Sequence, residues 1–258
     1  MVLEHAVGLR PDARYRPPGE VERRKFVIEM RELHIIGQVN GGLAQLGFTV
    51  TFDEDPATGR RYALVDDEPG SEWAWGLYLV DLSGPPSVLV EVPHPNSDLR
   101  TEEVGLAMWR AVPGAMLAVS GTHRRVGGGA GDVAHRTDSM FHAIAVDHAR
   151  RGVPQVQFHG FDDGSLPGVD VVVSVGNGRP GPIAREAADG IADKGLDVCV
   201  AWRSNCGELE GFRNKQGSAA ADHDAVFLHV ELSRSTRDTE SAWLRAVMAI
   251  AVAGLADR

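Results

Sequence analysis

The sequence has few cysteines, no long apolar segment and no excess of basic residues, and each shortage excludes a class of protein. Two cysteines, Cys199 and Cys206, are too few for a disulfide-stapled fold, and we expect them to be reduced thiols in a cytoplasmic protein. No segment approaches the length of a membrane span, and residues 1–22 lack the apolar core of a signal peptide. A net charge of −10 excludes a general nucleic-acid binder.

The composition is that of a globular protein with a substantial core. Hydrophobic residues make up 43% of the 258 residues and charged residues 24%, a balance typical of soluble domains. The polar, proline-containing residues 1–22 predict an N-terminal arm. The sequence therefore predicts one α/β domain over residues 23–258.

The first part of this domain has the pattern of a helix followed by an antiparallel meander. Apolar residues over 21–46 recur at helical spacing, interrupted by Gly41 and Gly42, which predicts one kinked helix. Strand-like runs separated by Asp-Pro, Thr-Gly and Pro-Gly turns follow at residues 47–52, 61–65 and 73–81. We expect these antiparallel strands to lead into a parallel core over residues 88–258.

Beyond residue 88, strand-like and helix-like segments alternate, which predicts a mixed, mostly parallel sheet flanked by helices. The predicted strands are residues 88–92, 115–120, 156–158, 169–175, 196–202 and 225–232. The predicted helices are residues 99–111, 132–151, 182–194 and 239–256. The polar, glycine-containing stretch 203–224 is long enough to be a lid or a substrate-binding loop.

A histidine and a carboxylate follow the first strand of the parallel core. The apolar run 88–92 ends at Pro93, so His94 lies at the carboxyl end of a buried strand, where α/β sheets bind ligands. If the loop turns, His94 and Asp98 can share a zinc ion. In the structural alternative, Ser97 or Asp98 only caps the following helix.

A second histidine and a buried glutamate complete a candidate catalytic site. His159 also follows a buried-type strand, and parallel strands bring their carboxyl ends together. His94, Asp98 and His159 are then three zinc ligands that leave a fourth position for water. Glu231 lies inside an apolar strand, where a carboxylate is costly unless it is paired or used, and is the candidate general base.

From residue 88 to the C-terminus, the order of these elements resembles the zinc carboxypeptidase superfamily, including amidohydrolase branches such as N-formylglutamate amidohydrolase and poly-gamma-glutamate hydrolase. By position, His94 and His159 match its two zinc-binding histidines, and the strand bearing Glu231 resembles the one that carries its catalytic glutamate. The resemblance implies a zinc carboxypeptidase/phosphorylase-hydrolase-like fold and zinc-dependent hydrolysis of a peptide-like or N-acyl amide.

The sequence departs from the family at the carboxylate ligand. The run from His94 to Asp98 has one residue more than the family spacing, so Glu102 and Glu103 stay open as alternatives to Asp98. The family also has an arginine that polarises the carbonyl or binds a substrate carboxylate. Arg124, the catalytic candidate, and Arg125, the substrate-binding candidate, both stay open for this role, because no local motif decides between them.

Two other functions are compatible with the sequence. The run from His94 to Asp98 also resembles the His-Pro-Asp-Asp-Glu motif of zinc-dependent N-acetylglucosaminyl deacetylases. That motif lies near the N-terminus of those enzymes and leaves Glu231 without a role, so this reading ranks second. A protein of another class, which binds a metal or small molecule without catalysis, fits the irregular spacing as well.

Further polar residues are candidates for substrate binding. His135 opens the predicted helix 132–151, and either lines the site or caps the helix. Asn214 and Gln216 lie in the long loop and could hydrogen-bond a substrate. The expected partner is a small-molecule or peptide-like amide. A homo-oligomer is compatible with the sequence, which does not fix the assembly.

Overall fold

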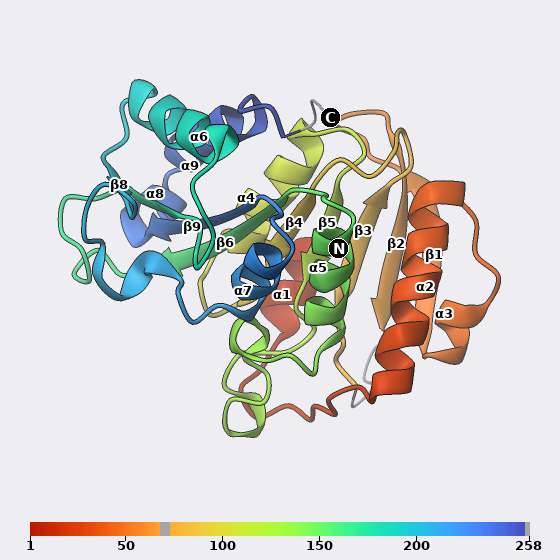
Figure 1. Ribbon diagram of the computed structural model, residues 1–258. Helices are drawn as coiled ribbons and strands as arrows, with labels where there is room; N and C mark the ends of the chain where they lie inside the picture. Colours follow the sequence, from red (N-terminus) through yellow and green to blue (C-terminus); the bar gives the residue numbers. More distant parts are fainter. Residues whose placement is uncertain (68–72, 256–258) are drawn as a thin grey trace.

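A nine-stranded mixed sheet runs through the whole computed structural model, which describes residues 1–67 and 73–255 (Figure 1). The strand order is β1-β2-β3-β5-β4-β6-β9-β7-β8. The strands are β1 (Phe48–Glu54), β2 (Arg61–Asp67), β3 (Leu77–Asp81), β4 (Leu89–Val92), β5 (Met116–Val119), β6 (Gln155–Phe161), β7 (Val171–Ser174), β8 (Val198–Val200) and β9 (Phe227–Ser233). The predicted Pro-Gly turn and the end of the predicted helix 239–256 lie outside the described residues.

The central strands β5, β4, β6 and β9 are parallel, which confirms the predicted mixed α/β sheet. Two details differ from the prediction. The meander β1-β2-β3 joins the core by antiparallel pairing of β3 with β5, so β3 is not the neighbour of β4 in the sheet although β4 follows it in the chain. Strand β7 pairs antiparallel with β9 and parallel with β8, so the outer part of the core runs in the opposite direction.

Helices cover both faces of the sheet (Figure 1). Helices α1 (Val2–Gly8), α4 (Thr101–Ala111), α6 (Pro182–Asp193) and α9 (Glu240–Ala251) share one hydrophobic core with one face. Helices α2 (Glu20–Ile36), α3 (Gly42–Gln45) and α5 (Met140–Arg150) share a second core with the other. The short α7 (Lys215–Asp222) packs beside α5, and α8 (Arg234–Asp238) follows β9.

Two predicted helices have different boundaries. The predicted single helix over 21–46 is two helices, because α2 ends at Ile36 and the next residue, Gly37, has a φ of +72°, in the left-handed region that favours glycine. The predicted helix over 132–151 begins only at Met140. There the Ser139 hydroxyl accepts a hydrogen bond from the backbone N–H of His142, while Val133–His135 is a separate 3-10 turn.

The N-terminal segment and the two cysteines also differ from the prediction. Within the arm expected over 1–22, α1 buries Val2 and Ala6 and packs on α4. Cys199 and Cys206 form a disulfide, so the prediction that they are free thiols is wrong. None of the described helices has both the length and the apolar character needed to cross a membrane.

Candidate metal centre

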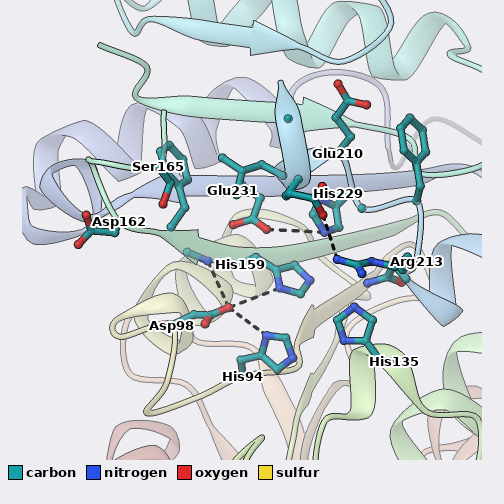
Figure 2. A pocket seen from close by; sticks show the side chains of 18 of the residues that line it. His94, Asp98, His135, His159, Asp162, Ser165, Glu210, Arg213, His229 and Glu231 are labelled. Carbon is teal, nitrogen blue, oxygen red and sulfur yellow. Dashed lines mark hydrogen bonds and ion pairs between the residues drawn. The ribbon is translucent and has the colours of Figure 1, made fainter. Parts of the chain in front are cut away.

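The parallel strands bring the predicted metal and base residues to one edge of the sheet. His94 lies two residues beyond the end of β4, His159 lies in β6, and Glu231 lies opposite His159 in the neighbouring β9. With Asp98 they line a cavity of about 700 Å³, and Figure 2 shows the four side chains turned toward one another. The positions that were far apart in the sequence therefore form one site.

His94 lies between two carboxylates. Its Nε2 is 2.8 Å from Oδ1 of Asp132, and its Nδ1 is 3.0 Å from Oδ2 of Asp98. Burial opposes a charge on this ring, but Asp98 and Asp132 together raise the pKa of His94 above its ordinary value. The surroundings of the ring thus favour a positive charge, and either a proton or a bound metal ion can supply it.

His159 approaches the same oxygen of Asp98 from the neighbouring strand. Its Nδ1 is 3.4 Å from Oδ2 of Asp98, and its Nε2 is 2.6 Å from Oε1 of Gln157. Burial lowers the pKa of His159 to about 4, so the ring is neutral at pH 7. Because Nε2 lies against the Gln157 side chain, Nδ1 is the ring nitrogen that faces Asp98.

The donor set of His94, Asp98 and His159 fits a zinc ion. Burial favours a protonated carboxyl at Asp98, but the adjacent His94 ring, which favours a positive charge, holds the pKa of Asp98 well below its ordinary value, so it is a carboxylate. The ligand atoms of the three residues lie within 4.8 Å of one another. Imidazole nitrogens and a carboxylate oxygen that face one another are stabilised by a cation between them, and zinc prefers these ligand types.

The structure places Asp98, and not the alternative carboxylates, beside the two histidines. Glu102 and Glu103 lie in the first turn of α4, and neither lines the cavity. Glu102 is buried, and its Oε2 has no hydrogen-bond partner among the described residues. The extra residue between His94 and Asp98 is absorbed by a turn in which the backbone N–H of Asp98 donates to the carbonyl of His94.

Glu231 has a neighbour in β9 that the sequence reasoning missed. His229 lies two residues earlier, and its Nε2 is 4.0 Å from Oε1 of Glu231. Its ring stacks on His159 with centroids 4.5 Å apart, and its Nδ1 has no partner among the described residues. Burial raises the pKa of Glu231 to about 8. The period of two along a strand, which puts His229 and Glu231 on one face, was the available signal.

Arg124 and His135 line the cavity, and Asp132 holds both. Asp132 accepts a hydrogen bond from Arg124 at 3.0 Å and lies 3.0 Å from Nδ1 of His135, while Arg124 also lies 3.5 Å from Asp98. The sequence analysis placed the run that begins at Asp132 near the site but gave Asp132 no role of its own, because a lone aspartate after a glycine-rich loop has no distinctive pattern. Arg125 is exposed and does not line the cavity.

The two amides predicted to bind substrate are engaged within the protein. Asn214 touches the cavity, but its Oδ1 accepts from the backbone of Gly217 and its Nδ2 donates to Gln157. Gln216 is fully buried behind the site, where its Nε2 lies 2.9 Å from the carbonyl of Val133. The rest of the stretch expected to be a lid includes a 3-10 turn, Gly207–Glu210, on the cavity wall, and α7.

Comparisons with known proteins find distant structural neighbours only. No protein-family model and no curated protein matches the sequence. A bacteriophage poly-gamma-glutamate hydrolase is 17% identical, with 65% of this chain and 83% of that chain covered and a TM-score of 0.43. A succinylglutamate desuccinylase from Vibrio parahaemolyticus is 13% identical, with 90% and 81% covered and a TM-score of 0.46. A zinc-free structure of YNDL is 13% identical, with 76% and 90% covered and a TM-score of 0.38.

The first of these structures bears the name of one of the amidohydrolases mentioned in the sequence analysis. With TM-scores below 0.5, none of them bears on the activity of this chain. The chemistry of the site has to come from its own residues.

Proposed function

We propose that this chain is a zinc-dependent hydrolase of an amide bond, with zinc held by His94, Asp98 and His159. One observation carries the proposal: Nδ1 of both histidines faces the same carboxylate oxygen, at 3.0 and 3.4 Å, on the wall of an open cavity. Each histidine has its Nε2 against an oxygen of another residue, which leaves Nδ1 available to a metal.

When bound, zinc lowers the pKa of a coordinated water to about 7 and polarises a carbonyl oxygen. Glu231 is the general base in this proposal. It lies in the cavity wall on the strand next to His159. Burial and Asp98 raise its pKa to about 8, and a cation held by the adjacent ligands would favour the carboxylate form that accepts a proton. Glu231 takes a proton from the attacking water and delivers it to the leaving nitrogen of the amide.

Arg124 supplies a fixed positive charge beside the metal ligands. Its guanidinium is held by Asp98 and Asp132 and is 31% exposed, so one side of it is open to the cavity. A guanidinium in this position orients the carbonyl or a carboxylate of the substrate. The cavity of about 700 Å³ is large enough for a small N-acyl or peptide-like amide.

The test separates metal binding from catalysis. We expect about one zinc per chain by elemental analysis, lost in His94→Ala and in His159→Ala and kept in His223→Ala, an exposed histidine at the end of α7. Glu231→Gln should keep zinc and lose turnover of a panel of N-formyl, N-acetyl, N-succinyl and γ-glutamyl amino acids that the wild type cleaves. Full activity in Glu231→Gln would contradict the role of the glutamate, and unchanged zinc in His94→Ala would contradict the site.

A further inference from the structure

One side of α2 exposes a row of apolar side chains. Val21, Ile28 and Ile35 are 79%, 54% and 61% exposed, whereas the opposite side of the helix buries Phe26 and Met30 in the second core. A single exposed aliphatic residue needs no explanation, but a row of three is typical of a surface that another molecule covers. In Figure 1, α2 lies on the outside of the molecule, at the end of the sheet that carries β1.

The spacing of Val21, Ile28 and Ile35 aligns them along the helix. They are seven residues apart, which is close to two helical turns, so the three side chains point in nearly the same direction over about 21 Å of helix. This repeat is the one that packs against a second helix. Within the described residues, α2 packs against α3, α5 and β3, and this packing leaves the row uncovered.

The row is symmetric about its middle residue. When two α2 helices pair antiparallel about a two-fold axis at Ile28, residues at equal distances before and after Ile28 lie at the same level. Val21 of one copy then meets Ile35 of the other, and Ile28 meets its own counterpart. Each apolar side chain faces another apolar side chain, and the contact is closed with two copies.

The charges beside the row fit the same arrangement. Lys25 and Glu32 lie on one side of the row, three residues before Ile28 and four residues after it. In the antiparallel pair, Lys25 of each copy therefore lies beside Glu32 of the other. Within one copy, Lys25 donates to Oε1 of Gln45 and Glu32 accepts from Nδ2 of Asn40, and neither has an oppositely charged partner among the described residues. A second copy supplies that partner to both.

On the other side of the row, the arrangement brings Arg24 of one copy near Arg31 of the other. Each of these arginines is already paired within its own chain, Arg24 with Glu20 and Arg31 with the buried Asp147. Their charges are therefore balanced before a second copy binds. The charges without a partner are the complementary ones on the first side.

We propose that this face of α2 is the interface of a homodimer, in which two copies of the chain pack through antiparallel α2 helices about a two-fold axis at Ile28. No residue of α2 lines the cavity, so the dimer leaves both cavities open. The dimer is independent of the proposed function, and its test needs no substrate and no metal.

Light scattering of the full chain measures the assembly between about 1 and 100 µM. We expect the wild type to be a dimer at the upper end of this range and Ile28→Glu to be a monomer throughout, because the substitution places two carboxylates against each other on the axis. Val252→Glu is the matched control, since it makes the same change at a 76% exposed residue at the end of α9, and it should dimerise like the wild type.

A wild type that is monomeric at the highest concentration would overturn the proposal. A dimer that Val252→Glu disrupts and Ile28→Glu leaves intact would overturn it as well, because the interface would then lie elsewhere.

Cysteine cross-linking tests the geometry, because both native cysteines are held in a disulfide and an added cysteine is the free thiol. On mild oxidation, Ile28→Cys should form a disulfide with its own counterpart. Val21→Cys and Ile35→Cys should not cross-link separately, whereas an equimolar mixture of the two should. Efficient cross-linking of Val21→Cys alone would indicate parallel helices and would overturn the arrangement.

Charge reversal tests the contact between Lys25 and Glu32. Lys25→Glu and Glu32→Lys should each raise the dimer dissociation constant about 3- to 10-fold, because each sets like charges side by side at two symmetric places. The double variant should return toward the wild-type value, because it restores opposite charges. A double variant that dimerises more weakly than either single variant would overturn the antiparallel pairing.

Discussion

Nε2 of His94 lies 2.8 Å from Oδ1 of Asp132, an aspartate 38 residues further along the chain. This contact turns Nδ1 of the ring toward Asp98. Asp132 thus does for His94 what Gln157 does for His159, with a charged acceptor in place of an amide. The difference matters, because a carboxylate also makes the ring a stronger metal ligand.

Asp132→Asn should weaken zinc binding by about 10- to 100-fold, because the ring loses the charged acceptor that orients it and raises its basicity. Chelator competition measures the change. Asp138→Asn is the control, since Asp138 pairs with Arg136 at the surface, and it should bind zinc like the wild type. Equal affinities in the two variants would show that Asp132 does not support the ligand.

The identity of the carboxylate ligand gives a second prediction. Asp98→Asn should lose zinc, because the amide removes the negative charge that both imidazoles face. Glu102→Gln should keep it, because Glu102 does not line the cavity. Elemental analysis of the purified variants measures their zinc content. Zinc kept in Asp98→Asn and lost in Glu102→Gln would show that the carboxylate ligand is Glu102 in α4.

The residues of the site differ in how far the sequence predicts them. His94 and Glu231 are predictable because each interrupts or ends an apolar strand, and a polar residue there needs a reason. Asp132 and Gln157 are not, because a carboxylate in a loop and an amide in a strand are common and only three-dimensional packing places them beside a histidine. The strands can be predicted from the local sequence pattern, whereas the residues that support the ligands are identified only by tertiary contacts.

The differences in the fold have the same origin. Alternating strands and helices predict the parallel strands β4, β5, β6 and β9, but the direction of β7 depends on which edge of the sheet it joins. The disulfide between Cys199 and Cys206 requires a turn that brings their Cα atoms to 6.0 Å, and no feature of the two segments signals it.

Arg237 supports a third prediction, which concerns stability. It is 4% exposed, and its guanidinium donates to the carbonyls of Leu232, Leu99 and Phe161. These carbonyls belong to β9, the segment before α4 and the end of β6, which are the segments that carry the site.

Arg237→Met should lower the free energy of unfolding by about 3 kcal/mol, because it leaves buried carbonyls without donors. Gly160→Ala should also destabilise, since a Cβ atom there would lie 2.3 Å from Cζ of Arg237. Arg234→Met is the control, because Arg234 pairs with Asp238 at the surface. Urea denaturation measures all three, and a wild-type midpoint for Arg237→Met would refute the structural role.

The disulfide gives a fourth prediction. It joins Cys199 in β8 to Cys206, seven residues further along, which directly precedes the part of the cavity wall that begins at Gly207. By the loop-closure argument, replacing Cys199 and Cys206 together by serine should cost about 2 kcal/mol of unfolding free energy. A reductant should destabilise the wild type by a similar amount and leave the double variant unchanged. Equal denaturation midpoints with and without reductant would contradict the bond.

A buried histidine far from the proposed metal ligands predicts how stability depends on pH. His34 is 3% exposed, its Nε2 lies 3.1 Å from the carbonyl of Gly114, and its Nδ1 has no partner among the described residues. Burial lowers the pKa of His34 from 6.5 to about 4. Between these values the unfolded chain binds a proton that the folded protein does not, so stability rises with pH across this window.

As the pH falls from 7 to 5, His34 should therefore remove about 2 kcal/mol from the free energy of unfolding. His34→Gln keeps a donor for the Gly114 carbonyl but does not titrate, so its unfolding free energy should fall less steeply over this window. Urea denaturation at pH 5, 6, 7 and 8 gives the slope of the unfolding free energy against pH for the wild type and for His34→Gln. The two slopes should coincide between pH 7 and 8, where His34 is neutral in both the folded and the unfolded state. Parallel curves from pH 7 to 5 would show that His34 is not held neutral by its burial.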